Sequence, residues 1–129
     1  MTSLIVIIDD QQEMRTLSRA ALEKAGFLVE DFESAAKGLD RLQSKPRPAL
    51  ILLDAVMPEM DGFGFLAAIA AKPEAARIPI VFCSSLVDLE RSKTPASVNI
   101  VARLDKPFTG AQLVKAIRDA LAQAVASRF

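Results

Sequence analysis

Five short apolar runs alternate with longer segments of helical periodicity, and this alternation limits the fold more than any other feature. The runs are residues 4–8, 27–32, 49–53, 80–83 and 100–104. The first, third and fourth are almost continuously apolar, as is typical of parallel strands covered on both faces. The pattern predicts a single α/β domain over residues 1–129, with helices on both faces of a parallel sheet.

The two remaining runs carry charged residues among their apolar ones. Glu30 and Asp31 lie in the second run, and Arg103 lies in the fifth. Such strands suit the edges of a sheet, where one side is less deeply covered. A doubly wound, flavodoxin-like sheet of five strands commonly has the order 2-1-3-4-5, which places these two runs at the edges. We therefore predict that strand order.

Helix signals lie between the runs. A periodic segment predicts a first helix that stops near Gly26, and Ser34 is a suitable cap for a second helix that ends by residues 45–48. A third helix is predicted over about residues 63–71. These helices would connect the predicted parallel strands by right-handed crossovers.

The carboxyl-terminal third gives one weak and one strong helix signal. Residues 88–99 contain Pro95 and several poor helix formers, so any helix there is expected to be short or irregular. Thr109 and Gln112 have the spacing of a capping box, and apolar residues then recur every four positions. A long final helix is predicted from this point.

Composition excludes several functions. Sixteen basic residues balance sixteen acidic ones, so no net field would attract nucleic acid or an anionic membrane. The chain has no histidine, and Cys83 is its single cysteine, which precludes an internal disulfide. Its apolar runs are far shorter than the roughly 20 residues that span a bilayer. We expect a soluble, cytoplasmic protein whose chemistry depends on carboxylates, hydroxyls and lysine.

Polar residues follow the predicted strands at their carboxyl ends: Asp9, Asp10, Asp54, Ser84 and Lys106. In a doubly wound sheet these ends meet at one edge, where ligands bind. Two carboxylates about 4 Å apart repel by roughly 4 kcal/mol at an effective dielectric of about 20, so three of them require a cation. Oxygen ligands favour Mg²⁺, and an Asp beside a metal and a Lys suits phosphoryl transfer. Asp54 is the candidate nucleophile.

The same residues carry a specific resemblance to a known family. They are Ile-Ile-Asp-Asp at 7–10, Asp-Ala-Val-Met-Pro-Glu-Met-Asp-Gly at 54–62, Ser84, and Asp-Lys-Pro-Phe at 105–108. Over essentially its whole length, the chain resembles the receiver domain of bacterial two-component response regulators, in particular a stand-alone receiver like the chemotaxis regulators.

The resemblance implies that Asp54 accepts phosphate from a sensor histidine kinase or a histidine phosphotransfer protein, and that Ser84 and Lys106 contact the phosphoryl oxygens. It implies a Mg²⁺ site formed by Asp9, Asp10, Asp54 and the main-chain carbonyl of Val56. Pro107 would follow a cis peptide bond, which is mostly a proline phenomenon. Such a domain is not a conventional enzyme, since it catalyses only its own phosphorylation and dephosphorylation. Its expected partners are a kinase and an unknown protein target, and it would be a monomer or weak homodimer.

Two departures from the family pattern lead to hypotheses. Many receivers have Tyr or Phe three residues before the Lys, where this chain has Arg103. A long cation is costly to bury, so Arg103 is expected to stay outward and to contact a partner. Val56 and Leu86, which flank the acceptor and Ser84, are apolar and cannot orient an attacking water. Slow self-dephosphorylation is expected.

Other interpretations stay open at this point. Asp9 and Asp10 also suit a simple helix cap, and Asp54 alone suits a turn. A small metal-dependent phosphatase or phosphotransferase would also use an aspartyl phosphate, although such enzymes usually have a second acid where this chain has Val56. A receiver-like interaction module that never binds phosphate is a third possibility, which the complete acidic set argues against.

Overall fold

A computed structural model of the chain describes residues 3–55, 61–84 and 97–126. In chain order the elements of this described part are β1 (Leu4–Ile8), α1 (Gln12–Lys24), β2 (Leu28–Phe32), α2 (Ala35–Arg41), β3 (Leu50–Asp54), α3 (Gly62–Ala70), α4 (Pro73–Ala76), β4 (Ile80–Ser84), β5 (Ile100–Asp105) and α5 (Gly110–Ala126). The strands agree with the predicted runs to within one residue at either end.

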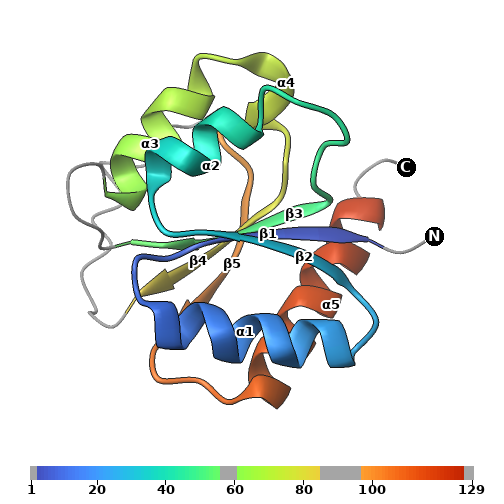
Figure 1. Ribbon diagram of the computed structural model, residues 1–129. Coiled ribbons are helices and arrows are strands. Elements are labelled where there is room, and N and C mark those ends of the chain that lie inside the picture. Colours follow the sequence, from blue (N-terminus) through green and yellow to red (C-terminus); the bar gives the residue numbers. More distant parts are fainter. Residues whose placement is uncertain (1–2, 56–60, 85–96, 127–129) are drawn as a thin grey trace.

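The strands form one parallel sheet in the order β2-β1-β3-β4-β5. Figure 1 shows α1 and α5 on one face of this sheet and α2, α3 and α4 on the other. The predicted α/β class, parallel pairing and strand order are therefore confirmed. The switch point lies between β1 and β3, because the chain winds outward from β1 in both directions.

The core consists of two apolar layers that share the sheet. Val6 and Ile8 of β1 pack toward α3, whereas Ile5 and Ile7 pack toward α1 and α5. This alternation follows from the two-residue period of a strand. Both layers contain fully buried side chains, so the central strands need apolar residues at every position, as their sequence has.

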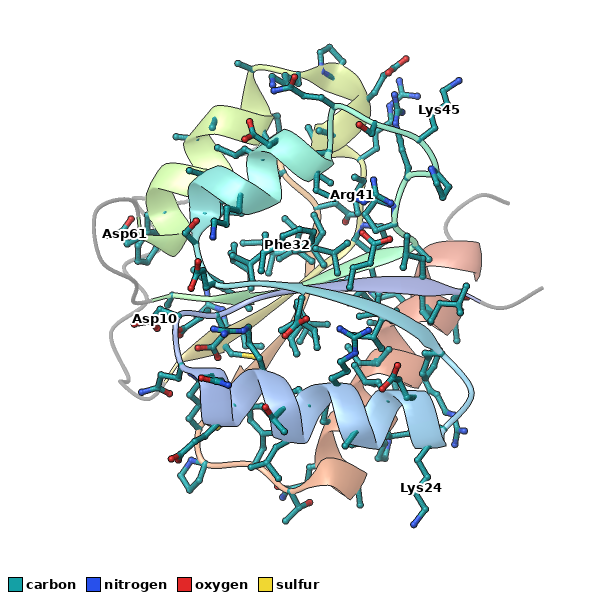
Figure 2. The ribbon with its side chains drawn as sticks, viewed as in Figure 1. Asp10, Lys24, Phe32, Arg41, Lys45 and Asp61 are labelled. Atoms are coloured by element: carbon teal, nitrogen blue, oxygen red, sulfur yellow. The ribbon has the colours of Figure 1, made fainter. Side chains whose placement is uncertain are left out.

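The edge strands are less deeply buried than the central ones, as predicted. Glu30 pairs with Arg41 of α2, and Asp31 pairs with two arginines of α1. Figure 2 shows Phe32, from the same strand, under α2, where it packs against the apolar layer. On the opposite edge Arg103 is exposed, so its expected outward position is confirmed in this structure. Its contact with a partner stays a prediction.

Two of the predicted helix signals are confirmed. Gly26 follows α1 with a φ of 102°, a conformation that favours glycine. Before α5, the Thr109 amide donates to Gln112 Oε1 at 2.8 Å and the Gln112 amide donates to Thr109 Oγ1 at 3.1 Å. This is the reciprocal pair of a capping box, and it places the start of α5 beside the end of β5.

The second helix begins as predicted and ends earlier than predicted. Ser34 accepts the Lys37 amide at 3.2 Å and caps α2. The helix stops at Arg41, and the amides of Gln43 and Ser44 then bond to carbonyls only three residues earlier. The Arg41 side chain donates to the carbonyls of Ser44 at 3.0 Å and Pro46 at 2.8 Å in this turn. The carbonyls are satisfied by a guanidinium instead of by helical amides.

The short helix α4 was not predicted, because its four residues are too few for a periodic pattern. Most of the segment 88–99 lies outside the described residues, so its predicted irregularity is not tested. Within the described part of the chain, no helix is long and apolar enough to cross a membrane.

Candidate functional site

Three aspartates meet at the carboxyl edge of the sheet. Asp9 follows β1 directly and Asp54 is the last residue of β3, so the pairing of these two strands brings them together. One carboxylate oxygen from each of Asp9, Asp10 and Asp54 lies within 4.8 Å of the other two. Figure 2 shows Asp10 at this end of the molecule, and Asp61, which precedes α3, toward the same side of the view. The structure therefore places these three predicted site residues in one cluster.

The cluster is half enclosed. Asp9 and Asp54 are only 6% and 5% exposed, whereas Asp10 is exposed. Buried carboxylates at this separation are unfavourable unless cations balance them. One balancing charge comes from Lys106, which lies directly after β5, and its Nζ is 3.2 Å from Asp9 Oδ2 and 3.3 Å from Asp54 Oδ1. The lysine thus joins the ends of three strands.

The protonation of Lys106 reflects this position. Burial acts to lower the pKa of its ammonium group, but the negative charges of Asp9 and Asp54 and their hydrogen bonds raise it by more. The pKa lies above its ordinary value, and Lys106 is a cation at neutral pH. A fixed positive charge beside Asp54 is suited to binding an anionic oxygen.

The residues present fit a divalent cation of the Mg²⁺ type. Three carboxylates carry three negative charges against the single charge of Lys106 in the cluster, and their oxygens are close enough to share one ion. Mg²⁺ is bound in proteins by one or two carboxylates, with waters and phosphate oxygens as its other ligands. Asp9, Asp10 and Asp54 would hold such an ion.

Hydrogen bonds in the surrounding loops set the direction of the first acid. The Asp9 amide donates to Phe32 O at 3.1 Å, and Asp9 Oδ1 accepts the Gln11 amide at 2.9 Å. Gln11 is the N-cap of α1 and makes no side-chain capping bond. Asp9 thus supports the local turn and also takes part in the cluster, so capping alone does not explain it.

The end of β3 is held by backbone contacts. Ala55 donates its amide to Cys83 O at 2.9 Å and accepts the Gly62 amide at 3.1 Å. A Cβ on Gly62 would lie 2.6 Å from the carbonyl oxygen of Asp54, closer than real Cβ atoms approach such an atom. The first residue of α3 therefore lies against the backbone of the candidate acceptor, and only glycine fits there without displacement.

The remaining predicted residues have different outcomes. The Lys106–Pro107 peptide bond is cis, as the resemblance implied. Ser84 is the last residue of β4, so its backbone lies at the same edge of the sheet. The structure does not describe its side chain, and its predicted contact with a phosphoryl oxygen stays a prediction. Val56 and Leu86 lie outside them as well, so the carbonyl ligand and the apolar flanks of the acceptor are not tested.

Two residues that contact Asp9 were not singled out from the sequence. They are Gln11, through its amide, and Arg15, which donates from Nη1 to the Asp9 main-chain oxygen at 2.8 Å. A cation six residues after an acid, early in a helix, is a possible signal for such a contact. In a sequence it cannot be told apart from a solvated arginine.

Comparisons with known proteins give one consistent family. The family model described as "Response regulator receiver domain" matches residues 5–118. The transcriptional regulatory protein GltR of Pseudomonas aeruginosa is 30% identical over 122 residues, which are 93% of this chain and 49% of that protein. The chemotaxis protein CheY of Halobacterium salinarum is 27% identical over 94% of this chain and 98% of its own length.

Solved structures agree with these relatives. The chemotaxis response regulator CheY4 of Vibrio cholerae has a TM-score of 0.83 and 26% identity, covering 93% of this chain and 99% of its own. This chain covers 49% of the length of GltR, and its match of 58 residues to the response regulator receiver protein CpdR of Brucella abortus covers 48% of that protein. The matched family, the sheet order and the acidic cluster lead to one conclusion: the chain belongs to the response regulator receiver domains of two-component systems.

Proposed function

We propose that Asp54 accepts a phosphoryl group from a phosphohistidine, carried by a sensor histidine kinase or a histidine phosphotransfer protein, in a Mg²⁺-dependent reaction. The observation that carries the proposal is the setting of Asp54. Asp54 is 5% exposed, and its carboxylate has an oxygen within 4.8 Å of oxygens of Asp9 and Asp10 and another contact to Lys106 Nζ at 3.3 Å. Nucleophile, metal ligands and a cation thus occupy the same strand ends.

In the proposed reaction, a carboxylate oxygen of Asp54 forms a bond to phosphorus while the bond from phosphorus to the donor nitrogen breaks. The electron pair of that broken bond leaves on the nitrogen. Lys106 holds one phosphoryl oxygen by its charge, and Asp9 keeps Lys106 in place through the 3.2 Å contact. A bound Mg²⁺ supplies neutralisation of the phosphoryl oxygens, and the protein supplies mainly positioning.

On this proposal the protein is a phosphorylation-controlled binding module and not a turnover enzyme. Phosphorylation changes the affinity of the domain for its target. The target is a protein on this proposal, because the balanced charge of the chain offers no general attraction to nucleic acid. A cytoplasmic location follows from the proposed phosphodonor, since kinases of this class draw on cytoplasmic nucleotide.

The direct test is phosphotransfer from a ³²P-labelled phosphotransfer protein to the 129-residue chain. The wild type should acquire label with Mg²⁺ and not with EDTA, and Asp54→Asn should acquire none. Asp61→Asn is the matched control, because Asp61 is an exposed carboxylate at the same edge that caps α3 by accepting the Gly64 amide at 2.9 Å. It should be labelled like the wild type.

Other results would select the alternatives. Label on Asp54→Asn at the wild-type level would reject Asp54 as the acceptor. Multiple turnover of a small phosphomonoester would favour the metal-dependent phosphatase. Absence of any response to Mg²⁺ with beryllofluoride, a phosphoryl mimic, would favour an interaction module that does not use phosphate.

A further inference from the structure

Arg15 connects the acidic cluster to the edge of the sheet. Its side chain is 14% exposed. The guanidinium donates from Nη1 to the Asp9 carbonyl oxygen at 2.8 Å, and its Nε lies 3.3 Å from Asp31 Oδ2. The Arg15 amide donates to Gln11 O at 3.0 Å, at the start of α1. Helical side chains lean toward the amino terminus, so an arginine at this position reaches back over the turn that follows β1.

Each polar atom of Asp9 has a protein partner. The amide bonds to Phe32 O, Oδ1 to the Gln11 amide, Oδ2 to Lys106 Nζ, and the main-chain oxygen to Arg15 Nη1. The last of these bonds differs from the others, because the carbonyl of Asp9 belongs to the peptide unit shared with Asp10. Holding this oxygen fixes ψ of Asp9 and φ of Asp10 together.

We propose that Arg15 is a positioning residue for the acidic pair: it holds the Asp9–Asp10 peptide so that both carboxylates stay at the separation a divalent ion requires. Asp31 in turn holds the guanidinium through its 3.3 Å contact. The inference depends on the proposed function, because it assumes that the acidic pair binds Mg²⁺. Arg15 itself binds no metal, and its effect acts through Asp9 and Asp10.

The sign of the effect separates positioning from charge. A cation near a Mg²⁺ site repels the ion, so its removal would tighten Mg²⁺ binding if charge alone mattered. Loss of a group that orients a metal ligand weakens binding instead, typically by about 10-fold or more. Weaker Mg²⁺ binding by the Arg15→Met variant would therefore mean that the positioning effect of Arg15 outweighs its repulsion of the ion.

Arg19 offers a matched control within the same helix. It lies one turn after Arg15 and pairs with the same carboxylate, with Nη1 2.9 Å from Asp31 Oδ1. Its side chain is 42% exposed, and its described bonds reach Asp31 and Glu23, not the acidic pair. Arg19→Met thus removes a cation and an ion pair from the same network without touching the Asp9 carbonyl.

The experiment is a calorimetric titration of the 129-residue chain with MgCl₂. Arg15→Met should raise the dissociation constant about 10-fold, and Arg19→Met should change it less than about 2-fold. Arg15→Lys keeps the charge but loses the planar fork, so it should also weaken binding. Asp31→Asn should weaken Mg²⁺ binding less than Arg15→Met does. A variant that carries both substitutions should lose no more affinity than Arg15→Met alone.

A merely structural role predicts a different result. In that case Arg15→Met would lower the free energy of unfolding in EDTA but leave the dissociation constant of the folded protein unchanged, which would overturn the inference. Tighter binding by Arg15→Met would overturn it too. If Arg15→Met fails to fold, Arg15→Lys and Asp31→Asn decide, and wild-type affinity in both rejects the inference. A wild type that binds no Mg²⁺ rejects the proposed function itself, which is a separate outcome.

Discussion

The apolar part of β3 and its last residue are both buried, yet we expect them to affect stability in opposite directions. On β3, Leu53 is fully buried and Asp54 is 5% exposed. Leu53 packs within an apolar layer, so its burial stabilises the fold. Asp54 carries a charge beside two other acids, so its burial opposes folding. The comparison indicates that the strand middles supply the stability that lets the strand ends hold a reactive, unfavourable cluster.

The largest effect is expected for truncation in a strand middle. Leu53→Ala should lower the free energy of unfolding by about 3 kcal/mol, because it removes buried methyl groups and leaves a cavity that helices and sheet fill only partly. Urea unfolding measured in EDTA tests this. Leu53→Met keeps most of the volume and should cost less than about 1.5 kcal/mol. Equal stability of all three proteins would contradict the assignment of this layer as the source of stability.

A substitution at Gly62 tests how strongly the backbone of Asp54, at the end of β3, is held in place. A Cβ there would meet the Asp54 carbonyl oxygen at 2.6 Å and a ring atom of Phe82 at 2.7 Å. Gly62→Ala should lower the free energy of unfolding by about 2 kcal/mol, because the end of β3 must move. It should also reduce the increase in the free energy of unfolding that Mg²⁺ produces, since the Asp54 carboxylate moves with its backbone.

Gly38 of α2 provides the comparison for that variant. A Cβ there would meet Ile8 Cδ1 and would lie 2.9 Å from Ile8 Cγ1, so both clashes are with side-chain atoms and not with backbone. Side-chain atoms yield more readily than the backbone of Asp54 does, and a helix favours alanine over glycine by about 1 kcal/mol. Gly38→Ala should therefore lower the free energy of unfolding by less than Gly62→Ala in the same urea experiment. It should leave the stabilisation by Mg²⁺ unchanged. The opposite ranking would show that the backbone of Asp54 yields easily.

Cys83 lies opposite Asp54 in the sheet register, at the border of the two regions. Burial raises the pKa of its thiol to about 12; Lys106 acts to lower it, while Asp54 and Asp9 raise it further. Because the ordinary thiol pKa is about 8.5, the thiol's contribution to stability is complete below that pH and is lost as pH rises toward 12. Between pH 8.5 and 10, this should remove on the order of 1 to 2 kcal/mol.

The measurement is the pH dependence of urea unfolding for the wild type and Cys83→Ala. Lysines titrate in both proteins, so the difference between the two slopes isolates the thiol. The wild type should lose stability more steeply above about pH 8.5. The native thiol should also fail to react with a disulfide reagent at pH 8 and react once in urea. A native thiol that reacts at the unfolded rate would show that this part of the sheet opens.

A smaller change, and one of opposite sign, is expected at the strand end. Asp54→Asn should raise the free energy of unfolding in EDTA by about 1 kcal/mol, because it relieves repulsion with the other two acids by more than it loses from Lys106. It should also abolish the stabilisation by Mg²⁺ seen in the wild type. Asp119→Asn, which removes an exposed carboxylate paired with Lys115 at 2.6 Å, should change stability by only a few tenths of a kcal/mol. A destabilised Asp54→Asn would mean that the cluster is already balanced without a metal.

The sequence allowed most of the fold and the centre of the site to be predicted. Continuous apolar runs identified the three central strands, and charges such as Glu30 and Arg103 identified the edges. Asp9, Asp54 and Lys106 were found because each lies at or directly after the end of a strand, and the carboxyl ends of parallel strands meet at one edge. The helix α4 and the early end of α2 were missed, because the first is too short for a period and the second is a turn in which backbone amides and the Arg41 side chain bond to nearby carbonyls.

By itself, the sequence determined which segments form strands and helices and which charged groups follow the strands, because these features depend on local periodicity and on residues adjacent in the chain. Only the tertiary structure decided how those groups are held. The bond from Arg15 to the Asp9 carbonyl and the closeness of Gly62 to the Asp54 backbone join parts of the chain at distances set by packing. A shift of about an ångström in the packing would break either contact, and no pattern of residues in the sequence specifies atomic positions that finely.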